Sequence, residues 1–144
     1  MKHSIKSIAI VLPDLKIGGA EKVYLNLSNS WIKKGIKIAF ILMKDEGQFR
    51  IKIPSIIKTY NLNVARIRNS IFPLRKILKN NNFDIVIAAM WPLTSAVVLA
   101  WILSGKKNKL FLSEHVHLTN SCLNELKKST LYLKFTLNLT YPFA

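Results

Sequence analysis

The sequence predicts an α/β fold in which a parallel sheet carries helices on both faces. Short apolar runs rich in β-branched residues recur along the chain, as is typical of strands buried in a parallel sheet. Segments with apolar residues at helical spacing alternate with these runs. Half of the 144 residues are hydrophobic, which excludes a disordered chain and suits one domain.

The first strand is expected over Ser7–Leu12, where no polar residue follows the serine. Residues 13–19, which contain a proline and two glycines, predict a turn. Apolar side chains then recur at every third or fourth position over residues 20–31, which predicts a helix. Gly35 is expected to end this helix.

The middle of the chain repeats this alternation. Residues 38–43 form a second apolar run, and residues 56–62 a less regular third one. A helix is expected to begin near Ser70, because apolar residues follow at helical spacing, and to end at the three asparagines 80–82.

Two more strands enclose a further helix. Residues 84–89 and Lys109–Ser113 predict strands, and residues 94–103 predict the helix between them. The leucines and phenylalanine of residues 121–139 fit both the alternation of a strand and the spacing of a helix, so the local pattern leaves this segment open.

One long uncharged segment offers an alternative to this α/β arrangement. Residues 85–104 carry no charge and are long enough to span a membrane. The β-branched start of the segment and the break at Trp91 and Pro92 favour a strand followed by a helix. The apolar run at residues 8–12 is too short for a signal peptide.

Basic residues outnumber acidic ones by 22 to 7, which gives a net charge of +15. Such a charge attracts phosphate groups, nucleic acid or an anionic membrane. The lysines are scattered, however, so we expect no nucleic-acid partner. Residues 66–79 combine apolar and basic side chains, which suits either a helix lying on anionic lipid or a sheet-covering helix with a solvated basic face.

Several residues at the predicted strand ends could bind a ligand. Gly18 and Gly19 let the backbone approach an anion at a helix start, although a tight turn alone would also need glycine. Glu114 and His115 follow a strand, and Trp91 could stack on a sugar or plug the sheet. Neither the histidines nor the single cysteine, Cys122, indicates a metal site.

Together these segments resemble the N-terminal part of family-4 glycosyltransferases. The likeness begins with IAIVLPDLKIGGAEKV at residues 8–23 and continues through LNLS at 25–28, residues 38–47, FDIVI at 83–87 and LSEH at 112–115. It is greatest to members that build lipopolysaccharide cores and capsules. The order and spacing of the segments make the resemblance more specific than any single motif.

The resemblance implies a GT-B architecture, in which two Rossmann-like domains enclose the active site. This chain is similar only to the N-terminal, acceptor-binding half, and it lacks a counterpart of the family's paired-glutamate donor motif. We therefore expect one Rossmann-like domain over residues 1–144, truncated and without the C-terminal nucleotide-sugar domain. No cofactor is expected, since the donor would bind to that domain. The family also implies a helix over residues 121–139.

The resemblance further implies a retaining transfer of sugar from a nucleotide donor to a lipid-linked glycan. The chain would lie peripherally at the inner, cytoplasmic face of the cytoplasmic membrane and be inactive alone. The family's glycine turn, which contacts phosphate or acceptor groups, maps to Gly18 and Gly19, and its strand-end histidine near the reaction centre maps to His115. We expect Glu114 and Trp91, which adjoin these positions, to bind substrate.

Two other classes of function remain open from the sequence. One is a non-catalytic module that binds anionic lipid or glycan and pairs with a separate donor-binding domain. The other is a small membrane protein that uses residues 85–104 as a single span.

Overall fold

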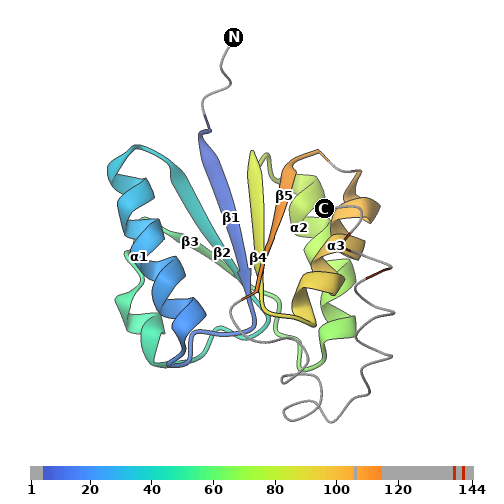
Figure 1. Ribbon diagram of the computed structural model, residues 1–144, viewed down its shortest axis with the longest axis horizontal. Helices are drawn as coiled ribbons and strands as arrows, with labels where there is room; N and C mark the ends of the chain where they lie inside the picture. Colours follow the sequence, from blue (N-terminus) through green and yellow to red (C-terminus); the bar gives the residue numbers. More distant parts are fainter. Residues whose placement is uncertain (1–4, 106, 115–137, 139–140, 142–144) are drawn as a thin grey trace.

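Five parallel strands form the sheet of the computed structural model, which describes residues 5–105, 107–114, 138 and 141. The strand order is β3-β2-β1-β4-β5, and every neighbouring pair is parallel. The strands are β1 Ser7–Leu12, β2 Lys37–Leu42, β3 Lys58–Asn61, β4 Ile85–Ala89 and β5 Lys109–Ser113. Their carboxyl ends lie at one edge of the sheet (Figure 1).

Helices cover both faces of this sheet, with α1 on one side and α2 and α3 on the other (Figure 1). The α-helices are α1 Gly19–Lys33, α2 Ile71–Asn80 and α3 Leu93–Ser104, and two 3₁₀ helices are η1 Gln48–Lys52 and η2 Ile67–Ser70. This arrangement confirms the α/β, Rossmann-like fold expected from the sequence.

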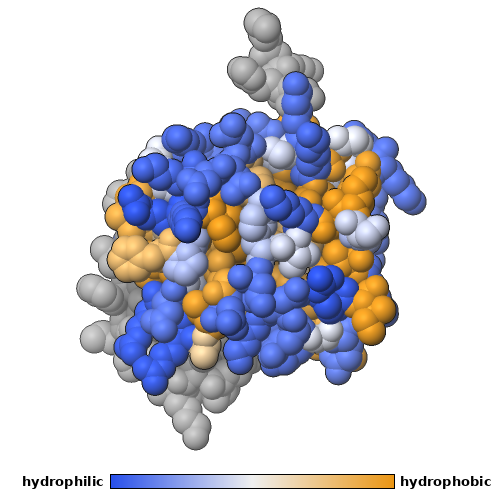
Figure 2. Space-filling model, turned by 180° about the vertical axis from the view of Figure 1, so that it is seen from behind, coloured by the Kyte–Doolittle hydropathy of each residue, from blue (hydrophilic) through white to orange (hydrophobic). Residues whose placement is uncertain are grey.

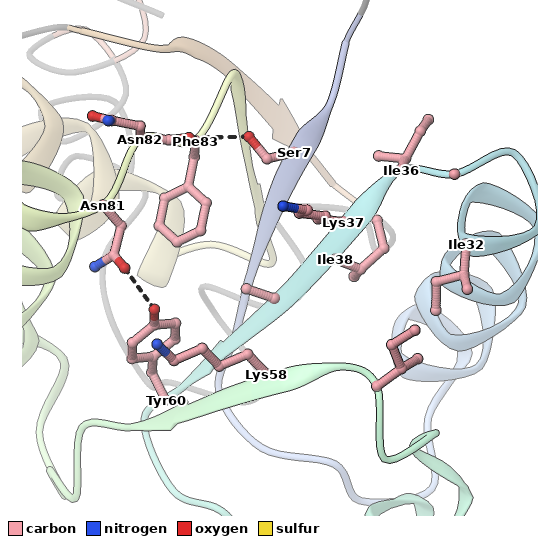
Figure 3. A pocket seen from close by; sticks show the side chains of 13 residues that line it. Ser7, Ile32, Ile36, Lys37, Ile38, Lys58, Tyr60, Asn81, Asn82 and Phe83 are labelled. Carbon is pink, nitrogen blue, oxygen red and sulfur yellow. Dashed lines mark hydrogen bonds between the residues drawn. The ribbon is translucent and has the colours of Figure 1, made fainter.

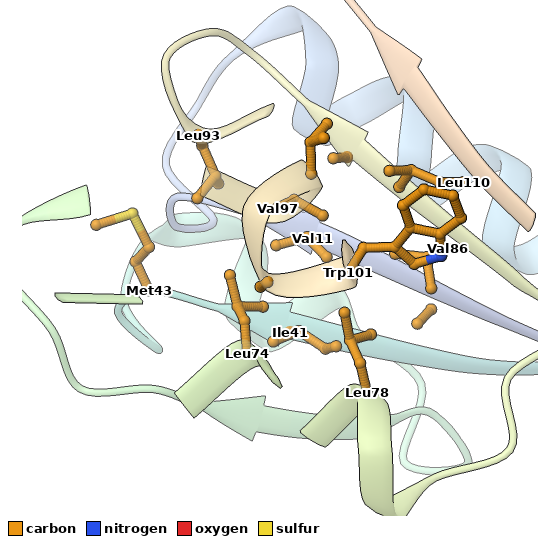
Figure 4. Close-up of a cluster of buried hydrophobic side chains, with 14 residues drawn as sticks. Val11, Ile41, Met43, Leu74, Leu78, Val86, Leu93, Val97, Trp101 and Leu110 are labelled. Carbon is orange, nitrogen blue, oxygen red and sulfur yellow. The ribbon is translucent and has the colours of Figure 1, made fainter. Parts of the chain in front are cut away.

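The core between the sheet and α2 and α3 explains the long uncharged segment. Leu74 and Leu78 of α2 and Val97 of α3 are almost fully buried against the sheet (Figure 4). The indole of Trp101 packs in the same cluster and donates a hydrogen bond of 2.9 Å to the carbonyl oxygen of Asn108. Helix α3 is apolar all round because it is buried on nearly all sides.

The second core lies between the sheet and α1. Tyr24 and Leu25 of α1 pack against alternate residues of β1 and β2, among them Ile10 and Phe40, whose side chains are fully buried. A strand whose alternate residues enter two cores must be apolar throughout, which is why β1 and β2 were recognisable as continuous runs.

The structure confirms the strand, break and helix expected over residues 85–104, because β4 ends at Ala89 and α3 begins at Leu93, and the alternative of a single span there is ruled out. Among the described residues, none of the helices combines the length and hydrophobicity that a membrane crossing requires. The structure corrects the sequence analysis elsewhere. Strand β3 is shorter than residues 56–62, and Ile56 is exposed. Helix η1 was not expected. The helix expected over 121–139 falls almost wholly outside the described residues.

Candidate functional site

The turn between β1 and α1 is built around Gly18, the residue before the helix. Gly18 has an extended backbone (φ −153°, ψ 166°) and provides no side-chain cap. A Cβ atom at this position would stand 2.2 Å from Oε2 of Glu21, so the carboxylate of Glu21 occupies the space above the glycine. Glu21 is only 6 % exposed. A side chain at position 18 would therefore displace the carboxylate of Glu21.

Gly19, the first residue of α1, differs from its neighbour. No heavy atom lies within 4 Å of the position that its Cβ would take, and its φ is not in the left-handed region. The fold would thus accept a side chain here. Because the first N–H groups of a helix have no partner within the helix, an exposed glycine at this point leaves them open to an anion.

A loop after β2 braces the glycine turn. The Leu15 N–H donates to the carbonyl oxygen of Glu46 at 2.8 Å, and the Phe49 N–H donates to the carbonyl oxygen of Leu15 at 2.9 Å. The ammonium of Lys16 lies 3.1 Å from a carboxylate oxygen of Glu46 and 3.4 Å from one of Asp14. An open depression lined by Lys16, Ile17, Gly47 and Gln48 lies beside this turn. These contacts between the loop after β2 and the glycine turn, which we call the brace, hold the turn in place at the carboxyl edge of the sheet.

Glu114, directly after β5, is the centre of a hydrogen-bond cluster at the same edge. One carboxylate oxygen accepts the backbone N–H of Trp91 at 2.9 Å, and the other accepts the hydroxyl of Thr94 at 3.1 Å. The hydroxyl of Tyr141 also donates to this second oxygen and lies 3.2 Å from the Thr94 hydroxyl. A negative charge beside the first turn of α3 complements the positive end of the helix dipole.

Two tyrosines near Glu114 are held in their neutral form. Burial raises the pKa of Tyr141, and its hydrogen bond to the Glu114 carboxylate raises it further. Burial also raises the pKa of Tyr24, against the opposing effect of its hydrogen bond with Ser113. Because Tyr24 belongs to α1 and Ser113 to β5, this contact joins the glycine-turn helix to the strand that carries Glu114.

The corner between β4 and α3 places Trp91 inside the molecule. Trp91 is 5 % exposed, so in this structure the residue packs against the protein, as the sheet-plug alternative describes. Met90, the preceding residue, has a left-handed backbone (φ 68°), and the Trp91–Pro92 peptide bond is cis. A non-glycine residue in the left-handed region is held there only by its surroundings, and such positions cluster at functional sites.

The structure brings some of the expected site residues together. Trp91 and Glu114 are directly hydrogen-bonded, and Gly18 and Gly19 lie at the same sheet edge on the next strand end. His115 lies outside the described residues. No group of three or more metal-ligating side chains occurs among the residues that were placed.

Sequence reasoning missed two partners of Glu114. Thr94 and Tyr141 are 20 and 27 positions away along the chain, so no local spacing connects them. The signal in the sequence was weak, because Thr94 shares its largely apolar helix with two further polar residues, Ser95 and Ser104. Its full burial is explained by the hydrogen bond to the carboxylate.

Comparison with known proteins agrees with the α/β fold. The family model described as Glycosyltransferase Family 4 matches residues 17–143. No curated protein matches the chain. A solved structure of UGT2 from Phytolacca americana, complexed with UDP-2fluoro-glucose and pterostilbene, superimposes with a TM-score of 0.56 at 9 % identity. The match covers 85 % of this chain and 33 % of that one, and such low identity shows a shared fold alone.

Proposed function

We infer that the chain takes part in sugar transfer, because it belongs to glycosyltransferase family 4. The observation that carries this inference is the family match, which runs through the described glycine turn, the Trp91 corner and Glu114. Within that activity we propose the acceptor-binding role, for a retaining enzyme that moves a sugar from a nucleotide donor to a lipid-linked glycan of a cell-surface polysaccharide.

The glycine turn is proposed to hold the phosphate of the acceptor. The first N–H groups of α1 have no partner within the helix and carry its positive dipole end, and the exposed Gly19 leaves the approach to them open. A lipid-linked glycan carries phosphate between its lipid and its sugar, so this contact would place the sugar near the same sheet edge.

Glu114 is proposed to act as a positioning residue for His115. Its carboxylate ties the end of β5 to the start of α3 through Trp91 and Thr94, which fixes the point where His115 leaves the strand. In this proposal His115 is the catalytic residue and hydrogen-bonds the transferred sugar, while Trp91 contributes its backbone N–H to the site. Glu114 acts through the geometry of the strand end.

Transfer itself is proposed to require a donor-binding domain. Positioning two substrates and excluding water both need a closed cleft. The chain spans 33 % of the solved structure to which it was compared. We therefore propose that residues 1–144 bind acceptor but do not turn over a nucleotide sugar alone. Sugar release from a nucleotide sugar by purified residues 1–144, with transfer to acceptor, would contradict this.

Peripheral association with the inner face of the cytoplasmic membrane is the proposed location. Phe72, in the first turn of α2, is 71 % exposed, and the nearby side chains of Arg66, Arg68 and Lys76 are exposed as well. An exposed aromatic ring among basic side chains suits an anionic lipid surface. The same surface supports the alternative of a non-catalytic lipid-binding module.

The acceptor role is tested by blocking the open approach at Gly19. In Gly19→Val the backbone conformation stays available, while the new side chain fills the space in front of the helix start. The matched control is Asn29→Val, at an exposed position of the same helix. Binding of a monosaccharide linked through diphosphate to a short isoprenyl chain is measured by calorimetry.

Gly19→Val should weaken this binding about tenfold or more, and Asn29→Val should leave it unchanged. Equal affinity of both variants would overturn the assignment of phosphate to the glycine turn. To separate the transferase from the non-catalytic module, a donor-binding domain of the family is added to residues 1–144. Restored sugar transfer favours the transferase, and acceptor binding without transfer favours the non-catalytic module.

A further inference from the structure

A cavity of about 540 Å³ lies at the amino ends of β2 and β3, at the opposite edge of the sheet from the glycine turn (Figure 3). Its volume falls within the range of small-molecule sites. It is formed by residues from β1, β2, β3, the end of α1 and the segment after α2. Gly18, Gly19, Trp91 and Glu114, the described residues of the proposed acceptor site, do not line it.

The cavity has two sides of different chemistry, which meet at the first residues of β2. Successive strand residues point to opposite faces, so Lys37 and Ile38 face opposite ways. Figure 3 shows Lys37, Lys58 and Tyr60 on one side of β2 and Ile32, Ile36 and Ile38 on the other. We call the first group the basic side and the second the isoleucine side.

The walls of the basic side are held in place by specific contacts. The hydroxyl of Tyr60 donates to Oδ1 of Asn81 at 2.7 Å, and Nδ2 of Asn81 donates to the carbonyl oxygen of Ile77 at 2.8 Å. The rings of Tyr60 and Phe83 meet edge to face, with centroids 6.4 Å apart. The ammonium of Lys58 lies 4.8 Å above the Tyr60 ring. The site is thus formed before a ligand arrives.

Within the described part of the chain, no acidic side chain neutralises the positive charge at this edge. No carboxylate is among the described residues that line the cavity, and the ion pairs found among all described residues involve Lys16 and Arg50 at the other edge. Asp84, just before β4, is occupied by the backbone N–H groups of Lys6 and Ser7, at 2.8 Å each. Lys37 and Lys58 are therefore available to an external anion.

The isoleucine side adds an apolar surface to this charge. Ile56, which lines the cavity together with Ile36 and Ile38, is 74 % exposed. Figure 2 shows hydrophobic side chains exposed between hydrophilic ones over the rear of the molecule. An inorganic anion would leave this apolar surface in contact with water, whereas a ligand with a hydrocarbon chain would cover it.

We propose that this cavity binds an anionic amphiphile, with a phosphate head at Lys37 and Lys58 and an aliphatic chain along the isoleucine side. Lysine binds phosphate as a flexible point charge, which suits two ammonium groups on neighbouring strands. The site lies apart from the acceptor edge and does not depend on the sugar-transfer proposal.

The test is calorimetric titration with monomeric dodecyl phosphate. Two further probes separate the sources of affinity: inorganic phosphate supplies the charge alone, and dodecyl maltoside supplies the chain alone. The variant Lys37→Glu with Lys58→Glu reverses the charge of the basic side, and Lys44→Glu, at an exposed position in the loop after β2 and outside the cavity, is the control. Circular dichroism checks that each variant is folded.

Dodecyl phosphate should bind the unmodified chain and the control alike, and the double variant about tenfold or more weakly. Both single-feature probes should bind much more weakly than dodecyl phosphate. Equal binding of dodecyl phosphate by the double variant would overturn the proposal, and so would dodecyl maltoside or inorganic phosphate binding as tightly as dodecyl phosphate.

A second measurement does not depend on the charge-reversed variants. Amide chemical shifts are followed by NMR as dodecyl phosphate is added. The largest changes should occur at Lys37, Ile38 and Lys58, and Ile56→Ser should weaken the binding of dodecyl phosphate but not that of inorganic phosphate. Shift changes confined to Gly18 and Gly19 would place the amphiphile at the acceptor edge and contradict the proposal.

Discussion

The backbone of Gly47 lies against the backbone of Leu15. A Cβ at Gly47 would stand 2.2 Å from the carbonyl carbon of Leu15 and 2.3 Å from the backbone nitrogen of Lys16. Gly47 also has φ 117° and ψ 161°, a region used almost only by glycine. The loop after β2 can brace the glycine turn only because this residue has no side chain.

Replacing Gly47 should therefore destabilise the fold more than replacing a glycine that needs only its backbone freedom. Gly47→Ala adds both left-handed strain and a clash with the β1–α1 turn, so we expect a loss of at least about 2 kcal/mol in the free energy of unfolding. Gly105→Ala is the control, because Gly105 has φ 98° but nothing within 4 Å of its Cβ position. Urea denaturation compares them, and equal losses would refute the brace.

Removing the Glu114 carboxylate should loosen the start of α3. Glu114→Ala leaves the Trp91 N–H and the buried Thr94 hydroxyl without their acceptor, at a cost of about 2 kcal/mol. Glu114→Gln should cost less, because its amide oxygen can face the Trp91 N–H while its nitrogen donates to the hydroxyl. Glu46→Gln, at an exposed ion pair, serves as control and should have a much smaller effect. An alanine variant as stable as the control would contradict the assigned contacts.

The sequence predicts the bounds of an element well where buried apolar residues mark them, and poorly where they do not. Strands β1 and β5 have the expected bounds, because both are short apolar runs that pair within the sheet. Strand β3 does not: Ile56 and Ile57 look like strand residues, but Ile57 N–H closes a turn to Pro54 at 2.9 Å. Helix η1 has no buried residue, so it leaves no hydrophobic pattern to read.

The sequence predicts only those residues of the candidate site that directly follow a predicted strand. Glu114 and the two glycines follow predicted strands, and strand ends of a parallel sheet meet at one edge. Thr94 and Tyr141 join the site through contacts between distant segments. The Gly47 brace is also non-local, since nothing in its neighbouring sequence reveals the Leu15 backbone that lies against it.

Asp84 should make stability depend on acid pH. Hydrogen bonds hold the pKa of Asp84 below its ordinary value of 3.8. The largest effect comes from the backbone N–H of Lys6, and the hydroxyl and backbone N–H of Ser7 add to it. Because the folded pKa is lowered, the stabilisation is present above about 3.8 and is lost as the pH falls through the folded pKa. The urea midpoint of the unmodified chain should exceed that of Asp84→Asn at neutral pH, and the difference should shrink at about pH 3. A difference independent of pH would contradict this.

Phe72 should matter for membrane association but not for folding. Its ring is 71 % exposed beside basic side chains, so Phe72→Ser removes a group that could insert into lipid without disturbing the core. Phe111→Ser is the control, at an aromatic residue 52 % exposed on β5. In flotation with phosphatidylglycerol vesicles, Phe72→Ser should reduce the bound fraction severalfold and Phe111→Ser should not. Equal loss in both variants would argue against α2 as the membrane contact.

The most direct test of the acceptor proposal is to map where a phosphate-linked sugar binds. The probe is a monosaccharide linked through diphosphate to a short isoprenyl chain, and the readout is the amide chemical shifts of residues 1–144. The acceptor proposal predicts that saturating probe shifts the amides of Gly18, Gly19 and Glu114. Binding with no change at these three residues would contradict it, and changes centred on Lys37 and Lys58 would move the phosphate site to the opposite edge of the sheet.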